Sequence, residues 1–439
     1  MSGLFRNKLL ILAGTAFLAR LIFVLIFPGG SYFDGISNSY THVAENILQG
    51  RGMVTLVDTA PLSSPEPNWN YVPFIDRPIG YLLLLLVPYA LFAHPVSIQV
   101  LHAMLSALTA ISLYRVGQRI VSENASWRAA LVYALWPLSA RFEIAALPDA
   151  VMPFFLVLTL WLLLRGLTER SLKWYLLTGI SSGIGMTMRP DILFLPLFLI
   201  VGMFLLKSAQ GRRNGAALVL VGVGIVVGAH TIRNYGATEG RILPLGLGNG
   251  ISMWEGISQF GDTLGTLYGD DRLAKLEGYR AWAYPDGIER DRKRFQDAIG
   301  IISSHPLWYA EMMLKRIPVL LTPDWIMTRK FAPSLKEYLA VSAGNNAAHY
   351  FAHYPVAALI RIALVFLQYV TLALALFALL RDRGHRLLWF PALLIFYYIV
   401  IHIPTNTEAR YFYPAIPLVL LLASHGWELI ARRRSAQKE

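Results

Sequence analysis

The sequence contains no cysteine among its 439 residues. This absence excludes disulfides, iron–sulfur clusters, thiolate metal sites and a cysteine nucleophile. Charge is scarce too, because only 15% of the residues are Asp, Glu, Lys or Arg, whereas 55% are hydrophobic and the mean hydropathy is +0.49. A soluble domain could not bury so much apolar surface, and many apolar runs approach the roughly 20 residues that span a bilayer. The composition therefore predicts a polytopic, all-α membrane protein embedded in membrane lipids.

The chain also lacks a clean internal repeat and any low-complexity tract, which argues against an inverted-repeat transporter. Its net charge of +12 is not a nucleic-acid footprint, because the basic residues cluster in short loops between apolar runs. We expect no nucleic-acid partner. The predicted spans are 9–27, 97–114, 128–140, 150–164, 174–187, 191–206, 216–232, 355–380, 387–403 and 411–430.

Every second loop between these spans is basic, as cytoplasmic loops are. This pattern places both termini in the cytoplasm, and we expect the membrane to be the bacterial cytoplasmic membrane. The first apolar run ends without an A-x-A-like cleavage site, which indicates an uncleaved span. The predicted outside loops are 28–96, 141–149, 188–190, 233–354 and 404–410.

One short apolar segment, 81–93, interrupts this arrangement. It carries Pro88, and as a full span it would move the later basic loops outside. We interpret it as a re-entrant or interfacial helix, so the predicted number of spans is ten to twelve. Three parts follow along the chain: a catalytic transmembrane module with its outside loop (1–232), an outside region of amphipathic helices (233–354), and a transmembrane module with a basic tail (355–439).

Acidic and basic side chains gather in the predicted outside turns. Asp34 follows the first span within FDGISNSYTHVAENILQGRGM, where a carboxylate at the membrane surface could act as a general base. Arginines that could bind a phosphate are Arg189 in MRPD, Arg233 in HTIRNYG and Arg410 in TEARYF. Further candidates for substrate contact or for a second acid are Glu45, Asp76, Arg77, Asp149 and Tyr411.

This mixture suits glycosyl transfer from a lipid-linked phosphosugar. The donor's polyprenyl tail needs a lipid-facing groove, and its phosphate suits arginine, whose planar fork can bind two oxygens. An acceptor hydroxyl needs a carboxylate within about 3 Å to take its proton. The leaving phosphate is a weak base and needs no strong acid catalyst. Asp34 would be the base, and the three arginines would stabilise charge on the leaving group.

The same residues have plainer interpretations. Asp34 and Asp149 could each cap a helix N-terminus. Asp76 and Arg77 could form a surface ion pair of little energetic value. Among the others, Glu45 could lie on a solvated helix face, Tyr411 in an aromatic belt, and the arginines could extend from span ends to lipid headgroups. Arg20, inside the first span, should face the bundle or extend outward, because charge in lipid is costly.

The ordered motifs resemble the polytopic membrane glycosyltransferases of the GT-C fold, especially the branch with protein O-mannosyltransferases and lipid A aminoarabinose transferases. The resemblance implies that the first-loop acid, Asp34, is catalytic. Many members carry two adjacent acids there, or a second acid that helps hold a divalent cation such as Mg²⁺ or Mn²⁺; this chain has Asp34-Gly35 instead. The motifs that carry the resemblance are AENILQGRG, DRPIGYLLLLL, EIAALPDAVMPFF, MRPDILFLPL, TIRNYGATEGRILPLGLGNG and EARYFYPAIPLVLLLA.

The sequence thus predicts an enzyme that moves a sugar from a polyprenyl-phosphate donor to a hydroxyl of a lipid, glycan or protein acceptor outside the cell. Three alternatives stay open. A lipid-linked glycan flippase or other transporter would need no acid at a fixed geometry. A ligase or polymerase of pyrophosphate-linked glycans would favour an arginine cluster in the late loop, for which the run 290–294 is the candidate. A non-catalytic accessory subunit is the third.

Overall fold

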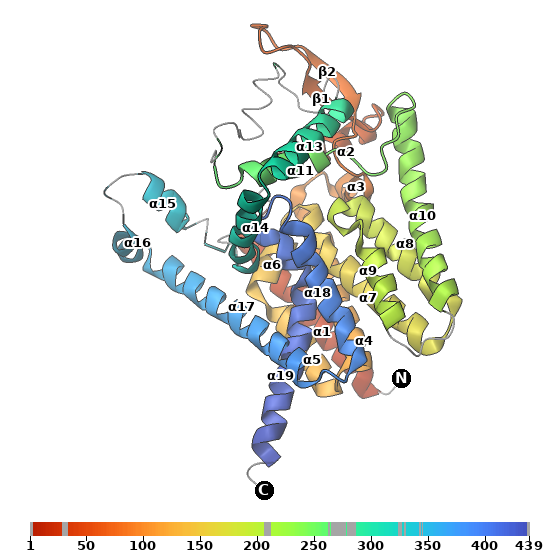
Figure 1. The fold of residues 1–439 in the computed structure, drawn as a ribbon, viewed down its shortest axis with the longest axis vertical. Helices are drawn as coiled ribbons and strands as arrows, with labels where there is room; N and C mark the ends of the chain where they lie inside the picture. The colour runs from red at the N-terminus through yellow and green to blue at the C-terminus, as the bar shows by residue number, and fades with distance from the viewer. Residues whose placement is uncertain are drawn as a thin grey trace.

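The computed structural model describes residues 3–28, 34–205, 212–261, 264, 278, 287–323, 327–328, 331–341, 344 and 346–436. A bundle of long helices forms the body, and a smaller group of helices with a β-hairpin covers one end of it (Figure 1). The first turns of α1 and the last turns of α19 lie at the opposite end of the bundle (Figure 1). This placement agrees with the predicted location of both termini on one side of the membrane.

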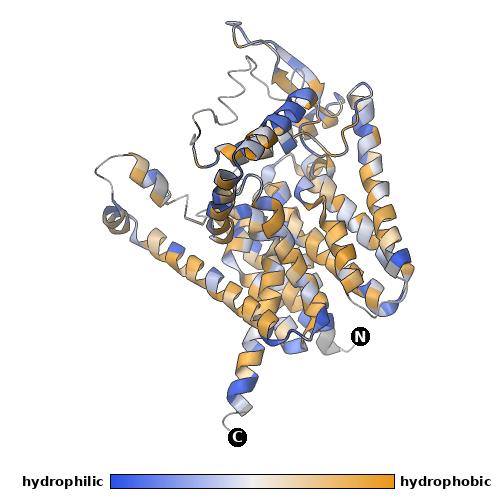
Figure 2. Ribbon diagram, in the orientation of Figure 1, coloured by the Kyte–Doolittle hydropathy of each residue, from blue (hydrophilic) through white to orange (hydrophobic). Residues whose placement is uncertain are grey.

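The bundle helices carry most of the apolar surface (Figure 2). They are α1 (Gly3–Ile26), α4 (Pro95–Ile120), α5 (Glu123–Leu135), α6 (Pro137–Glu143), α7 (Met152–Glu169), α8 (Leu172–Met188), α9 (Leu195–Leu205), α10 (Arg212–Ala237), α17 (Pro355–Arg381), α18 (Trp389–His402) and α19 (Ile416–Ala436). Within the described part of the chain, six helices are long and apolar enough to cross a membrane: Arg6–Ile26, Pro95–Ile120, Pro148–Glu169, Arg213–Ala237, Pro355–Arg381 and Ala409–Ser435. The prediction of a polytopic helical membrane protein is confirmed.

The other four predicted spans fall on shorter helices, so their crossings stay predictions. The span predicted at 128–140 is not one helix, because the chain turns at Trp136 between α5 and α6. Trp136 is extended (φ −65°, ψ 114°), the conformation that a following proline imposes. The segment predicted to be re-entrant or interfacial forms α3 (Gly80–Phe92), whose 13 residues are too few to cross a bilayer without tilting or a break.

The covering group contains α2 (Asp34–Leu48), α11 (Asn249–Ser258), α13 (Gly287–Ser304) and α14 (Pro306–Leu321), whereas α15 (Leu335–Val341) and α16 (Ala347–His353) lie to one side, beside the start of α17 (Figure 1). The covering group also contains an antiparallel hairpin of β1 (Val54–Asp58) and β2 (Trp69–Pro73). The all-α prediction missed this hairpin. Its strands are short but rich in β-branched and aromatic residues, and the Asp58 carboxylate closes the Pro-rich loop by accepting from the amides of Ala60 and Asn68. The division at 232 and 354 stays a prediction.

Arg20 faces the interior of the bundle. Its side chain has no exposed surface, and its Nε donates to the Glu143 carboxylate at 2.7 Å. Tyr133 and Tyr413 donate to the other oxygen of Glu143, and the Arg20 guanidinium also donates to the carbonyls of residues 133 and 134. Every group of this charge pair therefore has a partner, which is the condition under which an ion pair survives in a low-dielectric interior. Of the two interpretations of Arg20, the structure supports the one that faces the bundle.

Candidate active site

Two turns with the same local sequence, X-Pro-Asp, build the centre of the site. In LPDA, Pro148 begins a 3₁₀ turn (Pro148–Val151) and Asp149 follows it. In MRPD, Pro190 begins another (Pro190–Ile192), and Arg189 before it is extended at φ −150° and ψ 123°. Proline forces the preceding residue out of the helical region, so α8 ends at Met188 and the Arg189 side chain leaves the helix.

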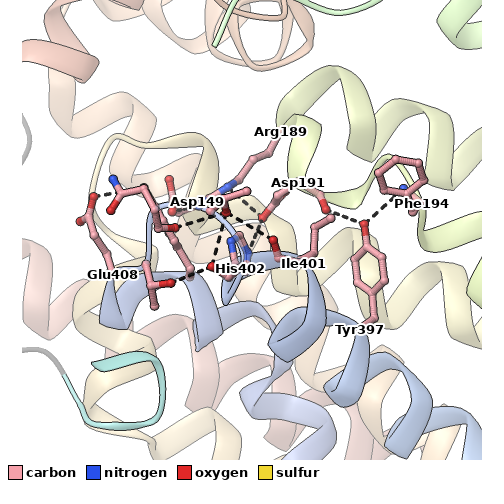
Figure 3. A network of polar contacts seen from close by, with 12 residues as sticks. Asp149, Arg189, Asp191, Phe194, Tyr397, Ile401, His402 and Glu408 are labelled. Atoms are coloured by element: carbon pink, nitrogen blue, oxygen red, sulfur yellow. Dashed lines mark hydrogen bonds and ion pairs between the residues drawn. The ribbon is translucent and has the colours of Figure 1, made fainter. Parts of the chain in front are cut away.

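The Arg189 guanidinium lies between two carboxylates (Figure 3). It pairs with Asp149 from the first turn and, through Nε, with Asp191 at 2.9 Å. The exposed fractions of these side chains are 12%, 10% and 10%, so the cluster is largely but not fully shielded from solvent. The N-cap residues of the first 3₁₀ turn and of α7, Leu147 and Val151, make no side-chain capping hydrogen bond, and the carboxylate of Asp149 faces Arg189. His402, at the end of α18, lies 3.4 Å from the Asp191 carboxylate.

Residues of the turn before α19 form the neighbouring wall. The Tyr411 ring stacks on His402, with 4.8 Å between ring centroids. The guanidinium carbons of Arg189 and Arg410 lie 4.5 Å and 5.3 Å from the centroid of the same tyrosine ring. Arg410 also pairs with Glu408 at 2.9 Å, and the Tyr411 hydroxyl donates to that carboxylate at 3.1 Å. Two of the three arginines predicted to bind phosphate therefore share one aromatic ring.

The segment 74–80, which contains DRPIG, approaches the same centre from another side. A Cβ on Gly80 would stand 2.6 Å from the backbone carbonyl of Thr187, so only glycine allows α3 to begin this close to the end of α8. Burial raises the pKa of the Tyr40 hydroxyl, and the charges of Arg77, Asp76 and Arg189 all act on it.

Burial also raises the pKa of the Asp76 carboxyl above its ordinary 3.8, although the adjacent Arg77 opposes this shift. Asp76 is half-buried rather than solvated. Desolvation therefore shifts the pKa of Asp76 more than the charge of Arg77 does. In a surface ion pair of little energetic value, both charges would instead be solvated.

Asp34 begins α2, but its side chain lies outside the described residues. Its neighbourhood is nevertheless defined by the next turn of the helix. The Ser37 hydroxyl donates at 2.7 Å to the carbonyl of Ala146, three residues before Asp149. One helical turn separates Ser37 from Asp34, so the first turn of α2 lies beside the loop that leads to Asp149.

Two residues predicted to belong to the site, Glu45 and Arg233, have partners outside the cluster around Arg189. The Glu45 carboxylate accepts from the Tyr89 hydroxyl at 2.5 Å. With a rise of 1.5 Å per residue, its Cα lies about 16 Å along α2 from that of Asp34, too far to act as a second acid beside it. Arg233 donates to the carbonyl of Phe74 at 2.7 Å and holds the strand that leads to Asp76. Its predicted role with phosphate stays a prediction.

Asp191 and His402 are site residues that sequence reasoning left outside the candidate list. A signal for Asp191 was present, since RPDI repeats the X-Pro-Asp pattern of LPDA. His402 carries no such pattern, and only packing places its ring against Tyr411.

A small open crevice adjoins the charged centre. Ala409 and Phe412 contribute to its wall, and Arg410 and Tyr411, between them in the chain, turn to the polar side. The crevice is lined by Gln368 and by eight mainly apolar residues: Trp136, Leu138, Phe142, Pro323, Ala409, Phe412, Tyr413 and Ile416. Gln368 belongs to α17, a helix that slants away from the bundle (Figure 1) and exposes apolar side chains such as Leu359 and Phe366.

The described residues do not form a ready cation site. Among them, no three His, Asp or Glu side chains gather as potential metal ligands. The two acids closest to the centre, Asp149 and Asp191, are both occupied by Arg189. We therefore derive no step through Mg²⁺ or Mn²⁺.

The fold and this site define a class of protein: a polytopic helical membrane protein of the GT-C fold with a charged centre beside an apolar crevice. The family model for dolichyl-phosphate-mannose-protein mannosyltransferase matches residues 76–231, which contain Asp76, Asp149 and Arg189. No curated protein sequence matches the chain.

Similar solved structures include the oligosaccharyltransferase AglB from Archaeoglobus fulgidus in complex with an inhibitory peptide and a dolichol-phosphate, at a TM-score of 0.54 and 13% identity over 100% of this chain and 52% of that one. The same enzyme tethered to an acceptor peptide matches at 0.52 and 13% identity over 97% and 50%. This chain therefore spans about half the length of these proteins. ArnT from Cupriavidus metallidurans bound to undecaprenyl phosphate matches at a TM-score of 0.38 and 13% identity over 99% of this chain and 79% of that one.

These matches show that the fold is shared at low identity, and the family model matches about a third of the chain. The resemblance to GT-C glycosyltransferases predicted from the sequence is confirmed.

Proposed function

We propose that the protein transfers a sugar from a polyprenyl-phosphate donor to a hydroxyl group of an acceptor on the outer face of the membrane. One observation carries this proposal. Two arginines, Arg189 and Arg410, flank Tyr411 in a largely buried centre, and the mainly apolar crevice begins at the adjoining residues of the same turn. A lipid phosphate has the matching chemistry, with an anion to meet the guanidinium groups and a hydrocarbon tail for the crevice.

The proposed step is a single displacement at the anomeric carbon. The acceptor oxygen attacks this carbon, the bond from carbon to phosphate oxygen breaks, and its electron pair leaves with the polyprenyl phosphate. The acceptor proton passes to the carboxylate of Asp34, the proposed base. Charge grows on the leaving phosphate, and the arginines stabilise it. The anomeric configuration is inverted.

Arg189 has two carboxylate partners before the donor arrives. A phosphate at this guanidinium must therefore exchange with Asp149 or Asp191 or share their hydrogen bonds. Arg410 pairs with Glu408 and directly follows Ala409, which lines the crevice. We therefore assign the first contact with the phosphate to Arg410 and the stabilisation of its developing charge to Arg189.

Asp76 is a second candidate for the base, because burial raises its pKa and its charge acts on Tyr40 together with that of Arg189. A base with a raised pKa is better matched to neutral pH than an ordinary carboxylate. Asp76→Asn and Asp34→Asn therefore belong in the same experiment.

The ligase alternative receives little support from the run 290–294. Arg292 and Lys293 are exposed and pair with acids on their own helix, Glu289 and Asp297. Asp291 and Arg294 are buried, and Asp291 accepts from amides at the start of α11, so these two residues belong to the packing of the helices rather than to an open arginine cluster. A transporter would favour charge inside the bundle that can change partners, whereas Arg20 is fully paired there.

The test is release of polyprenyl phosphate by the purified protein from a panel of polyprenyl-phosphate sugars with candidate acceptors. We expect release with at least one donor, its loss in Asp34→Asn, and normal release in the matched control Asp297→Asn, which removes an exposed acid paired with Lys293. Loss in Asp76→Asn but not in Asp34→Asn would reassign the base. Absence of release from every donor, with tight binding of a pyrophosphate-linked glycan, would contradict the proposed function.

A further inference from the structure

The loop 403–408 joins two parts of the candidate site. His402 precedes it and contacts Asp191, whereas Arg410 and Tyr411 follow it. The position of this loop therefore sets the distance between the Asp191 side of the centre and its Arg410 side. What holds the loop is not the bundle alone but the group formed by α11, α13 and α14, which we call the cap unit.

Hydrogen bonds tie the loop to α11 residue by residue. The Asn406 amide donates to the carbonyl of Ser252 at 3.1 Å. The Gln259 side chain donates to the carbonyl of Thr407 at 2.5 Å and accepts from its amide at 3.3 Å. A Cβ on Gly256 would stand 2.9 Å from the carbonyl carbon of Thr405, so the loop lies directly on the helix surface.

Arg316 of α14 closes this arrangement. Its side chain is fully buried, and its guanidinium donates to acceptors on both partners: the carbonyl of Gly256 and the Gln259 side chain on α11, and the carbonyl of Ile403 at 2.8 Å. Among the described residues it has no carboxylate within ion-pair distance. A buried cation of this kind is costly unless its donors are used, and here three acceptors from two segments use them.

Tyr309 provides a second connection from α14. Its hydroxyl donates to the carbonyl of Pro404, and the Arg316 guanidinium lies 5.4 Å from its ring centroid. The ring itself belongs to the apolar core of the cap unit with Trp254 and Ile257. The cap unit thus contacts the loop as one packed body.

We propose that Arg316 is a positioning residue for the donor-phosphate site: by fixing loop 403–408 to α11, it sets where Arg410 and Tyr411 stand relative to Arg189. Arg316 touches neither reactant. This inference rests on the proposed function for its kinetic part, but its structural part does not depend on turnover.

The experiment compares three variants with the wild type. Arg316→Lys keeps the charge but cannot span three acceptors with one ammonium group. Gly256→Ala displaces the loop by steric contact and leaves Arg316 unchanged. Lys315→Gln is the matched control, since Lys315 is an exposed cation on the same helix that pairs with Glu311.

Three quantities are measured on the whole protein. They are the hydrogen–deuterium exchange of the peptide covering 402–411, kcat/KM for the donor, and the unfolding temperature. In both Arg316→Lys and Gly256→Ala we expect faster exchange at Asn406 and Thr407, a largely retained unfolding temperature, and a loss of about ten- to a hundredfold in kcat/KM, because small misplacements of catalytic groups are this costly. Lys315→Gln should match the wild type.

Faster exchange with unchanged kinetics would overturn the inference, as would unchanged exchange in Arg316→Lys. A uniform rise in exchange across the whole protein with a lower unfolding temperature would also overturn it, because it would mark a purely structural arginine. If the wild type releases no polyprenyl phosphate from any donor, the proposed function fails, whereas the local exchange result still decides whether Arg316 holds the loop.

Discussion

Two buried arginines, each paired with acid, differ in what surrounds the pair. Arg20 and Glu143 form one arginine–carboxylate pair whose side chains are 0% and 1% exposed, and tyrosines and carbonyls occupy their remaining positions. Arg189 has two carboxylates, partial exposure, and partners from three separate turns. The first arrangement is closed and stabilises the bundle. The second can exchange a partner, which is what a binding site requires.

The surroundings of Arg20 and Arg189 also differ in their charge balance. The inner pair is neutral, because one cation meets one anion. Around Arg189, two acids meet one guanidinium, and Arg410 with Glu408 adds one charge of each sign. Such an unequal set of charges stabilises the fold poorly, because a charge without an opposite partner loses its hydration and gains little in return. The excess is one negative charge, so a phosphate can enter by displacing an acid from Arg189, and such a change of partner suits a binding site.

The largest effect should come from breaking the inner pair. Glu143→Ala leaves Arg20 buried without its partner, which typically costs about 3–5 kcal/mol. We expect a sharply lower unfolding temperature and poor yield of folded protein in detergent. The double variant Arg20→Met with Glu143→Leu should recover much of this loss, because apolar groups need no compensation. If the Glu143→Ala protein were as stable as the wild type, the pair of Arg20 and Glu143 would not be a source of stability for the bundle.

Arg189→Lys should have the opposite signature. The ammonium group retains the charge but loses the planar fork that reaches two acids and the ring of Tyr411. We expect donor turnover to fall about a hundredfold or more, as for the loss of a group that stabilises developing charge, with little change in unfolding temperature. Calorimetry beside the release assay separates the two quantities. If Arg189→Lys lowered both the donor turnover and the unfolding temperature, Arg189 would be a structural residue like Arg20.

Tyr411 should give a smaller effect that depends on its ring. Tyr411→Leu removes the surface shared by Arg189 and Arg410, and a cation–π contact is worth about 0.5 to 2 kcal/mol. Tyr411→Phe keeps the ring and loses only the hydrogen bond to Glu408. We expect the donor KM to rise more in the leucine variant than in the phenylalanine variant. Equal effects would assign the role to the hydroxyl group.

The smallest effect should appear in the pH dependence of stability at Asp76. Its folded pKa is raised above 3.8, so the folded state binds the proton more tightly than the unfolded state does. The wild type should therefore lose stability as the pH rises from about 4 through the folded pKa. Asp76→Asn lacks this loss and should gain in unfolding temperature, relative to the wild type, between pH 4 and pH 7. A difference that stays constant with pH would contradict burial as the cause.

Much of the site could be located from the sequence because its members follow local rules. Each X-Pro-Asp turn places a charged side chain in a loop between predicted spans, and Pro190 also ends α8, so Asp149 and Arg189 were identified as candidates from the sequence. Glu45 stays a candidate for substrate contact, but its nearness to Asp34 in sequence conceals a separation of about three helical turns. Asp149 was weighed as a helix cap, and its true partner, Arg189, lies 40 residues further along the chain.

The sequence by itself determined the class of environment and the local conformations: apolar runs must lie in lipid or in a core, and Pro190 must make Arg189 extended. Only the tertiary structure decided which charged turn meets which, that Arg20 finds Glu143, and that Arg316 reaches loop 403–408. The physical reason is that periodicity and turn chemistry act over a few residues, whereas a charge in a low-dielectric interior is stabilised by whichever partners the packing of distant helices brings within hydrogen-bond distance.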